Sequence, residues 1–303
     1  CILHRDIQLL DRGHKEEPFA LALEDGREQP HHLGARDRQP RGGRLARAAR
    51  AAHERGKLAE ADIRTGARHM DGGVQHFAVP SPFDYARQSE VLIVTDIARG
   101  DLPALANAYA RLIVAAGGGT LGLFTAIRRL RGVHARIADR LARAGLPLYA
   151  QHVDPIDTGT LVDIFRDDPR ASLIGTDALR DGVDVPGHSL RCVVMEQVPW
   201  PRPDILHKAR RLAGGGSAYD DRIIRARLAQ AFGRLIRSKD DSGHFIVLSP
   251  AFPSRLLSAF PPGTPVRRCT LSEALQAVQS GVSARGNEGA RIDPVTGSGG
   301  EMR

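Results

Sequence analysis

The sequence predicts an α/β fold in which a mostly parallel β-sheet carries helices on both faces. From residue 81 onward, short apolar runs alternate with longer segments whose apolar residues recur at helical spacing. A strand that is apolar along most of its length, such as 89–95 (SEVLIVT), is typical of a parallel sheet covered on both sides. Glycine or proline follows several of these segments, as at Gly117-Gly118-Gly119. The alternation of strands with helices therefore favours this fold class.

The elements are expected in a simple order along the chain. The predicted strands span residues 89–95, 120–125, 146–151, 171–175, 191–198, 244–248 and 266–269. The predicted helices span residues 102–116, 127–144, 159–166, 220–238, 253–260 and 271–279. Ligands of such sheets bind at the carboxyl ends of the strands, so we expect functional residues in the segments that follow them.

Composition divides the chain of 303 residues into three parts. Residues 1–76 are rich in Arg, His and Gly, and we expect them to be poorly ordered. Residues 77–280 form the predicted folded domain, and the Gly/Ser-rich stretch 281–303 is predicted to be a disordered tail.

Charge and cysteine content limit the partners and cofactors. The net charge of +8 favours a polyanionic partner. The three cysteines are widely separated, so the sequence predicts no disulfide framework and no metal site. No apolar run reaches the length of a membrane span, so we expect no membrane partner and a cytoplasmic location.

One predicted helix, 220–238, carries a basic motif. Its sequence Gln230-Ala-Phe-Gly-Arg-Leu-Ile-Arg237 places Gln230, Arg234 and Arg237 three and four residues apart, hence on one helical face. Gly233 lies within this predicted helix, which suggests that another group closely approaches the backbone there. Two guanidinium groups suit phosphate oxygens, although such a face is often only solvated.

A second motif, GTDALRDGVDVPG at residues 175–187, directly follows a predicted strand. The two motifs together resemble motifs V and VI of the DinG/XPD-type DNA helicases of superfamily 2, whose patterns are G-T-D-x-x-x-x-G-V-D-x-P-G and Q-x-x-G-R-x-I-R. The resemblance extends from about residue 81 to 279. It includes 123–125 (LFT), which is similar to motif IV, and 198–203 (VPWPRP), which is similar to the family's L-P-F-P-x-P segment. The resemblance implies a RecA-like domain of the P-loop NTPase type, the second of the two that such a helicase contains.

The resemblance also implies roles for individual residues. Arg234 and Arg237 would be catalytic and face the γ-phosphate of ATP, one of them as the arginine finger. Gln230, Gly233 and Asp184 would lie at the nucleotide. Thr125, Thr176 and Arg128 would contact phosphates of single-stranded DNA. We expected the two motifs to meet at one edge of the sheet.

The chain departs from a complete helicase in one respect. It contains no G-x-x-x-x-G-K-[ST] phosphate loop and no D-E-A-H-like box, so the resemblance implies that ATP and Mg²⁺ are held mainly by a first RecA-like domain. The four cysteines of the iron–sulfur cluster that many relatives carry are also missing. We therefore expect the chain alone not to hydrolyse ATP.

Three functions remained open from the sequence. The first is the C-terminal half of an ATP-dependent DNA helicase, which would need a partner domain bearing the phosphate loop. The second is a non-catalytic, nucleic-acid-binding relic of a helicase. The third is an unrelated α/β nucleotide binder, for which the expected Gly-rich phosphate turn is not found.

Overall fold

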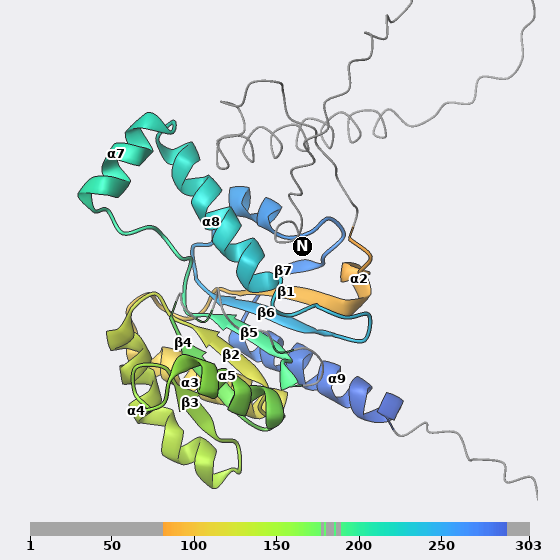
Figure 1. Ribbon diagram of the computed structural model, residues 1–303. Helices are drawn as coiled ribbons and strands as arrows, with labels where there is room; N and C mark the ends of the chain where they lie inside the picture. Colours follow the sequence, from red (N-terminus) through yellow and green to blue (C-terminus); the bar gives the residue numbers. More distant parts are fainter. Residues whose placement is uncertain (1–80, 177–178, 180–184, 186–188, 290–303) are drawn as a thin grey trace, which may run out of the picture. The chain divides into compact units, whose positions relative to one another are not determined.

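The computed structural model describes residues 81–176, 179, 185 and 189–289, and those from Pro82 onward belong to one compact unit (Figure 1). The predictions for residues 1–76, for Asp184 and for residues 290–303 of the tail lie outside the described residues.

The core of this unit is a seven-stranded sheet with the order β3-β4-β2-β5-β6-β1-β7. Every pair of neighbouring strands is parallel, which confirms the predicted fold class. The strands are β1 (Ser89–Val94), β2 (Thr120–Leu123), β3 (Leu148–Ala150), β4 (Ser172–Gly175), β5 (Cys192–Met195), β6 (Gly243–Leu248) and β7 (Val266–Cys269). Because all seven run the same way, their carboxyl ends share one edge of the sheet and their amino ends share the other.

Helices cover both faces of the sheet (Figure 1). On one face, α3 (Leu102–Ala116), α4 (Ile127–Arg143) and α9 (Leu271–Gly289) pack on strand residues such as Leu92 and Ile246. On the other face, α5 (Thr158–Asp167), α8 (Ser217–Phe232) and the 3₁₀ helix η3 (Ser254–Ala259) pack on the alternating set, which includes Val91 and Phe245. Successive strand residues point to opposite faces, so both sets must be apolar, and this explains the continuous apolar runs in the sequence.

The turn from α3 into β2 explains the Gly117-Gly118-Gly119 run. All three glycines have positive φ, and Gly117 ends α3 in the left-handed conformation that glycine adopts most readily. A Cβ on Gly118 would lie only 2.2 Å from the carbonyl oxygen of Arg170. These glycines therefore let the chain turn tightly, and α3 ends at the residue that the sequence predicts.

Four helices differ from the sequence-based expectation. The helix predicted to end at residue 238 is α8, which ends at Phe232. An additional helix, α7 (Ile205–Ala213), occupies a stretch for which no helix was predicted, and the short α2 (Tyr85–Gln88) precedes β1. Finally, α9 continues to Gly289, beyond the predicted end at residue 279.

The unpredicted α7 has a simple cause. The side chain of Asp204 accepts a hydrogen bond from the backbone N–H of His207 at 2.7 Å and so caps the first turn. None of the helix residues is buried, and Ile205 and Leu212 are both largely exposed. Its apolar residues Ile205, Leu206 and Leu212 recur at helical spacing, so the periodic signal is present in the sequence, and the sequence-based prediction overlooked it.

Candidate functional site

The basic motif lies at the end of α8 and in the loop that leads to β6. The apolar stripe predicted for this helix is confirmed, since Ile224, Leu228 and Phe232 are all buried. Gln230 is exposed in the last turn, whereas Arg234 and Arg237 lie beyond the helix end. The expectation that all three polar residues share a face of one continuous helix is therefore wrong.

Gly233 is the residue at which α8 stops. It has φ −63° and ψ −9°, which any amino acid adopts, so its backbone conformation does not require glycine. A Cβ at this position would meet only backbone oxygens of the preceding turn, the nearest being that of Ala229 at 3.3 Å. Among the described residues, nothing from another element closely approaches Gly233, so the predicted close approach stays a prediction for a partner.

The loop after α8 is held by two side chains that bind its backbone. The buried Asp241 carboxylate accepts hydrogen bonds from the backbone N–H groups of Arg237 and Ser238, at 2.7 and 2.8 Å, and from the Ser238 hydroxyl. The Gln88 side chain donates to the carbonyl oxygens of Ser238, Lys239 and Asp241 at 2.9–3.0 Å. The path of the main chain at Arg237 is thus fixed from both sides.

Arg237 itself is only partly exposed. Burial lowers the pKa of its guanidinium group, and the charge of Asp241 opposes that shift. Arginine stays charged throughout the physiological range in spite of such a shift. The loop therefore presents a positive charge of restricted mobility, as the binding of a phosphate group requires.

This loop lies at the amino-terminal edge of the sheet. Gln88 directly precedes β1, and the parallel strands β1 and β6 begin side by side, with Ser89 opposite Gly243. The carboxyl ends of the strands, where Thr125 and Thr176 follow β2 and β4, form the opposite edge. At about 3.3 Å per residue, the six-residue β6 separates the edges by roughly 20 Å. The prediction that both motifs meet at one edge is therefore wrong, because α8 runs antiparallel to the strands and carries its end away from the carboxyl edge.

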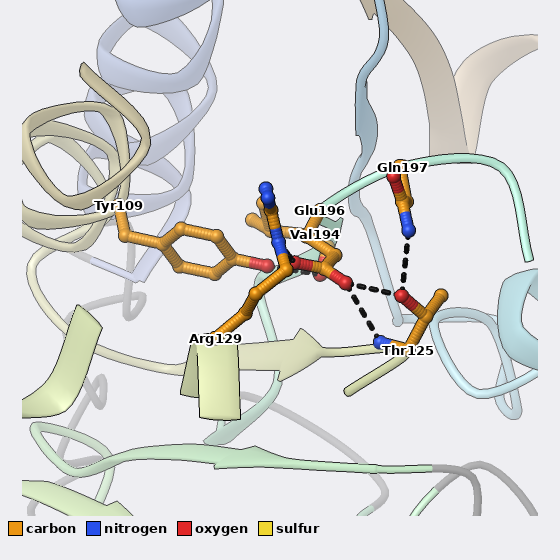
Figure 2. A network of polar contacts seen from close by, with 6 residues as sticks. All are labelled: Tyr109, Thr125, Arg129, Val194, Glu196 and Gln197. Atoms are coloured by element: carbon orange, nitrogen blue, oxygen red, sulfur yellow. Dashed lines mark hydrogen bonds and ion pairs between the residues drawn. The ribbon is translucent and has the colours of Figure 1, made fainter. Parts of the chain in front are cut away.

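At the carboxyl edge, Thr125 belongs to a network centred on Glu196 (Figure 2). The Glu196 side chain, which is fully buried, accepts hydrogen bonds from the backbone N–H of Thr125 at 2.9 Å and from its hydroxyl group. Its other oxygen pairs with Nε of Arg129 at 2.6 Å. Gln197 donates to the Thr125 hydroxyl oxygen at 2.7 Å. The carboxylate thus joins the end of β5 to the end of β2 and the first turn of α4.

Tyr109 of α3 forms the inner boundary of this network (Figure 2). Its hydroxyl group donates to the carbonyl oxygen of Val194 at 3.1 Å, and its ring stacks on Phe124 with a centroid distance of 4.9 Å. Burial, and secondarily the negative charge of Glu196, raises the pKa of the Tyr109 hydroxyl well above its ordinary value. Tyr109 therefore remains a neutral hydrogen-bond donor on the core side of the network.

Thr176, which follows β4, is also engaged by side chains. Its backbone N–H and hydroxyl groups contact the Gln151 side-chain oxygen at 3.0 and 3.1 Å, and its hydroxyl oxygen lies 3.2 Å from Nε2 of His152. Thr125 and Thr176 thus come from adjacent strands of the sheet, and Arg128 is exposed in the first turn of α4. The structure brings the three proposed DNA contacts to one edge and places Gln230, Arg234 and Arg237 on the other side of the domain.

Sequence reasoning missed two of the residues that organise these edges, Glu196 and Asp241. Each is an acidic residue next to a strand, which is the one signal that could have marked it: Glu196 directly follows the apolar run of β5, and Asp241 precedes that of β6. A buried carboxylate needs donors around it, but the donors here come from distant parts of the chain.

Within the described ranges there is no group of three or more His, Cys, Asp or Glu side chains that could hold a metal ion. The helices in the same ranges include none that is long and apolar enough to span a bilayer.

Comparison with known proteins identifies the domain. A family model described as the helicase C-terminal domain matches residues 109–261. The ATP-dependent helicase DinG of Mycobacterium tuberculosis is 38% identical over 183 residues, which are 56% of this chain and 27% of that protein. The 3′-5′ exonuclease DinG of Bacillus subtilis is 33% identical over 135 residues, covering 42% of this chain and 14% of that protein. The ATP-dependent DNA helicase YoaA of Escherichia coli is 29% identical over 218 residues, covering 67% and 34%. The chain thus spans about a third of these relatives or less.

Proposed function

Because the chain belongs to the helicase C-terminal domain family, we propose that it is the second RecA-like domain of an ATP-dependent DNA helicase. In this role it supplies the arginine finger for ATP hydrolysis and part of the track for single-stranded DNA. The first RecA-like domain, with the phosphate loop and the Mg²⁺ carboxylate, is its partner. The relatives DinG of M. tuberculosis and YoaA, both named ATP-dependent helicases, support this assignment.

The observation that carries the proposal is the fixed loop at Arg237. An arginine finger acts on negative charge that develops at the transferred phosphoryl group, and it works best when its position is set in advance. Asp241 and Gln88 hold the main chain on either side of the Arg237 Cα, while neither side chain of this pair is needed to form the sheet. Arg234 lies one turn earlier and partly exposed, where it can reach the same anion.

These residues fit a nucleotide bound by a partner domain. Arg234 and Arg237 supply positive charge and forked donors, and the exposed Gln230 adds an amide at the end of α8. ATP with Mg²⁺, when bound, supplies the phosphoryl group whose transfer drives the motor.

The contacts at the carboxyl edge indicate which of the proposed DNA-binding groups are available to bind a phosphate directly. Arg128 is exposed and suits a phosphate directly. The hydroxyl group of Thr125 has only one proton to donate, and it already donates this proton to the Glu196 carboxylate. Thr125 can therefore donate its hydroxyl proton to a DNA phosphate only after it releases Glu196, whereas Arg128 requires no such exchange.

The test is to place the chain behind the first RecA-like domain of a DinG relative and measure ATP hydrolysis and unwinding with single-stranded DNA present. The proposal expects DNA-stimulated hydrolysis in the joined protein and none in the chain alone, because the chain lacks the phosphate loop. Steady ATP hydrolysis by the isolated chain would contradict the proposal that a partner domain supplies the phosphate loop.

DNA binding by the chain alone separates the helicase domain from the alternatives. The affinity for single-stranded DNA should fall steeply with salt, and Arg128→Ala should reduce the slope of log K against log salt by about one. The exposed Arg143, at the far end of α4, provides the matched control Arg143→Ala. DNA binding without any activity in the joined protein would instead favour the non-catalytic relic.

A further inference from the structure

A cavity of about 80 Å³ opens at the carboxyl edge beside the Glu196 network. Its lining comes from the segments that directly follow β1, β5 and β6, together with Leu105 and Arg129 from α3 and α4. The polar lining groups are Arg99, Arg129, Glu196, Gln197 and Ser249. The aromatic lining residue is Trp200, and none of the roles assigned above uses it.

Trp200 is presented on a short and stiff segment. Prolines 199 and 201 flank it and restrict the backbone on both sides, since the proline ring fixes φ. The buried Pro199 is anchored to α8, because its carbonyl oxygen accepts a hydrogen bond from Nη1 of Arg227 at 3.0 Å. The backbone N–H of Trp200 is bound to the carbonyl oxygen of Val198 at 2.9 Å. The main chain that carries the indole is therefore held in place.

The exposure of this side chain is unusual for its type. Trp200 is 44% exposed, although tryptophan is highly buried on average and removes a large apolar surface from water when it is covered. A fixed, half-covered indole at the mouth of a cavity is the arrangement by which proteins stack a planar ring.

The charges around the cavity indicate what kind of ring would stack there. The carboxylate of Glu196 is already paired with Arg129, so it does not repel an anion as a free carboxylate would. Arg99, in the segment after β1, is exposed and also lines the cavity. The lining thus combines one aromatic ring with a net positive charge, the combination that single-stranded nucleic acid binds through its bases and its phosphates.

The cavity is continuous with the proposed DNA track. Gln197 lines the cavity and donates to the Thr125 hydroxyl oxygen at 2.7 Å. A strand that crosses the carboxyl edge past Arg128 and Thr125 therefore reaches the cavity next.

We infer that Trp200 is a stacking platform for one nucleobase of single-stranded DNA, with Arg99 contacting a phosphate beside that base. The inference rests on the proposed function, in which the strand lies along this edge. Stacking on an indole is tolerant of sequence because every base has a π-face. The contact would therefore hold the strand without selecting its sequence.

The chain contains a single tryptophan, so its fluorescence reports on Trp200 alone. In the full chain, titration with a short oligothymidylate should quench this emission in step with binding measured by anisotropy of a labelled oligonucleotide. Trp200→Ala should weaken oligothymidylate binding about tenfold, the loss expected for one stacked base. It should leave the affinity for an abasic oligomer of the same length unchanged, because that oligomer offers phosphates but no bases.

Three variants complete the test. Trp200→Phe should recover part of the lost affinity. Arg99→Ala should weaken both oligomers equally and reduce the salt slope by about one. Ile205→Ala truncates an exposed apolar side chain of α7, outside the cavity lining, and should change neither affinity.

The outcomes separate this inference from the proposed function. Oligothymidylate binding with unchanged tryptophan emission, or a Trp200→Ala variant that binds both oligomers like the native chain, would overturn the stacking role and leave the DNA track standing. Quenching by ATP but not by the oligomer would assign the cavity to a free nucleotide and also overturn it. If neither oligomer binds at low salt, the DNA track and the stacking platform fail together.

Discussion

The two edges of the sheet hold the candidate site residues in different ways. At the carboxyl edge, Glu196 binds the backbone N–H and the hydroxyl group of Thr125 and pairs with Arg129, and Gln151 binds the same two groups of Thr176. At the amino edge, the side chains of Gln88 and Asp241 bind mainly the main chain around Arg237. The carboxyl edge thus fixes individual polar side chains together with their main chain, whereas the amino edge sets the shape of a loop that carries two arginines.

One helix connects the two regions. Arg227, in the middle of α8, is bound to the backbone beside Trp200, and the helix ends at the loop that carries Arg234 and Arg237. Its 16 residues span about 24 Å at 1.5 Å per residue.

The largest expected effect separates the edges by function. In the joined helicase, Arg237→Ala or Arg234→Ala should lower ATP turnover by about 10³–10⁵, because a finger acts in the transition state. The affinity for single-stranded DNA should stay unchanged, since the proposed DNA contacts lie at the other edge. Turnover and DNA anisotropy measured on the same preparations test this.

Arg237→Lys should fail almost as badly as Ala, because a point charge cannot reproduce the guanidinium fork. The exposed Arg143→Ala serves as the control for loss of a positive charge. Near-normal turnover in both alanine variants, or loss of the fold in either, would refute the assignment of these arginines.

The next effect tests whether the Glu196 network holds the carboxyl edge together. Glu196→Ala should lower the free energy of unfolding by about 3–5 kcal/mol, because it leaves the partly buried Arg129 and the Thr125 N–H without their partner. Urea-induced unfolding of the full chain measures this change. Asp163→Ala breaks the exposed ion pair with Arg166 and should cost less than about 1 kcal/mol. Equal losses in the two variants would show that the network does not stabilise the fold.

A smaller loss is expected from the cradle at the amino edge. Asp241→Ala removes the acceptor of two backbone N–H groups and one hydroxyl group, and it should lower the free energy of unfolding by about 2–4 kcal/mol. In the joined helicase its turnover should also fall, with DNA affinity unchanged, because the loop that places Arg237 loosens. Asp241→Asn keeps one oxygen acceptor, so its free energy of unfolding and its turnover should lie between those of the native protein and those of Asp241→Ala. A variant that loses stability but keeps full turnover would show that the finger does not depend on this loop.

The smallest effect concerns Gly233. Gly233→Ala should change the free energy of unfolding of the isolated chain by less than about 1 kcal/mol, because its backbone conformation suits alanine and the new Cβ meets only the carbonyl oxygens of Ala229 and Gln230. If a partner domain closely approaches this backbone, turnover of the joined helicase should nevertheless fall. Unchanged turnover would leave Gly233 without a role at the nucleotide.

Much of the fold followed from local patterns. The predicted strands and helices between residues 102 and 175 agree with the structure within a few residues, since apolar runs and glycine turns are recorded directly in the chain. Helix α7 was overlooked although Ile205, Leu206 and Leu212 have helical spacing, and the end of α8 was misplaced because Leu235 and Ile236 continue its apolar pattern into a buried loop.

The arrangement of the candidate site was not predictable from the sequence, and the roles of Arg234, Arg237, Thr125 and Thr176 stay predictions. The motif spacing was enough to identify the family and to propose these residues. It could not show that α8 runs back along the sheet and separates the arginines from the threonines by roughly the length of a strand. Nor could it show which donors surround Glu196 and Asp241, because Thr125 lies 71 residues from Glu196 and Gln88 lies 153 residues from Asp241. Periodicity and turns depend on neighbours in the chain, whereas the pairing of buried polar groups depends on which distant segments the sheet brings side by side.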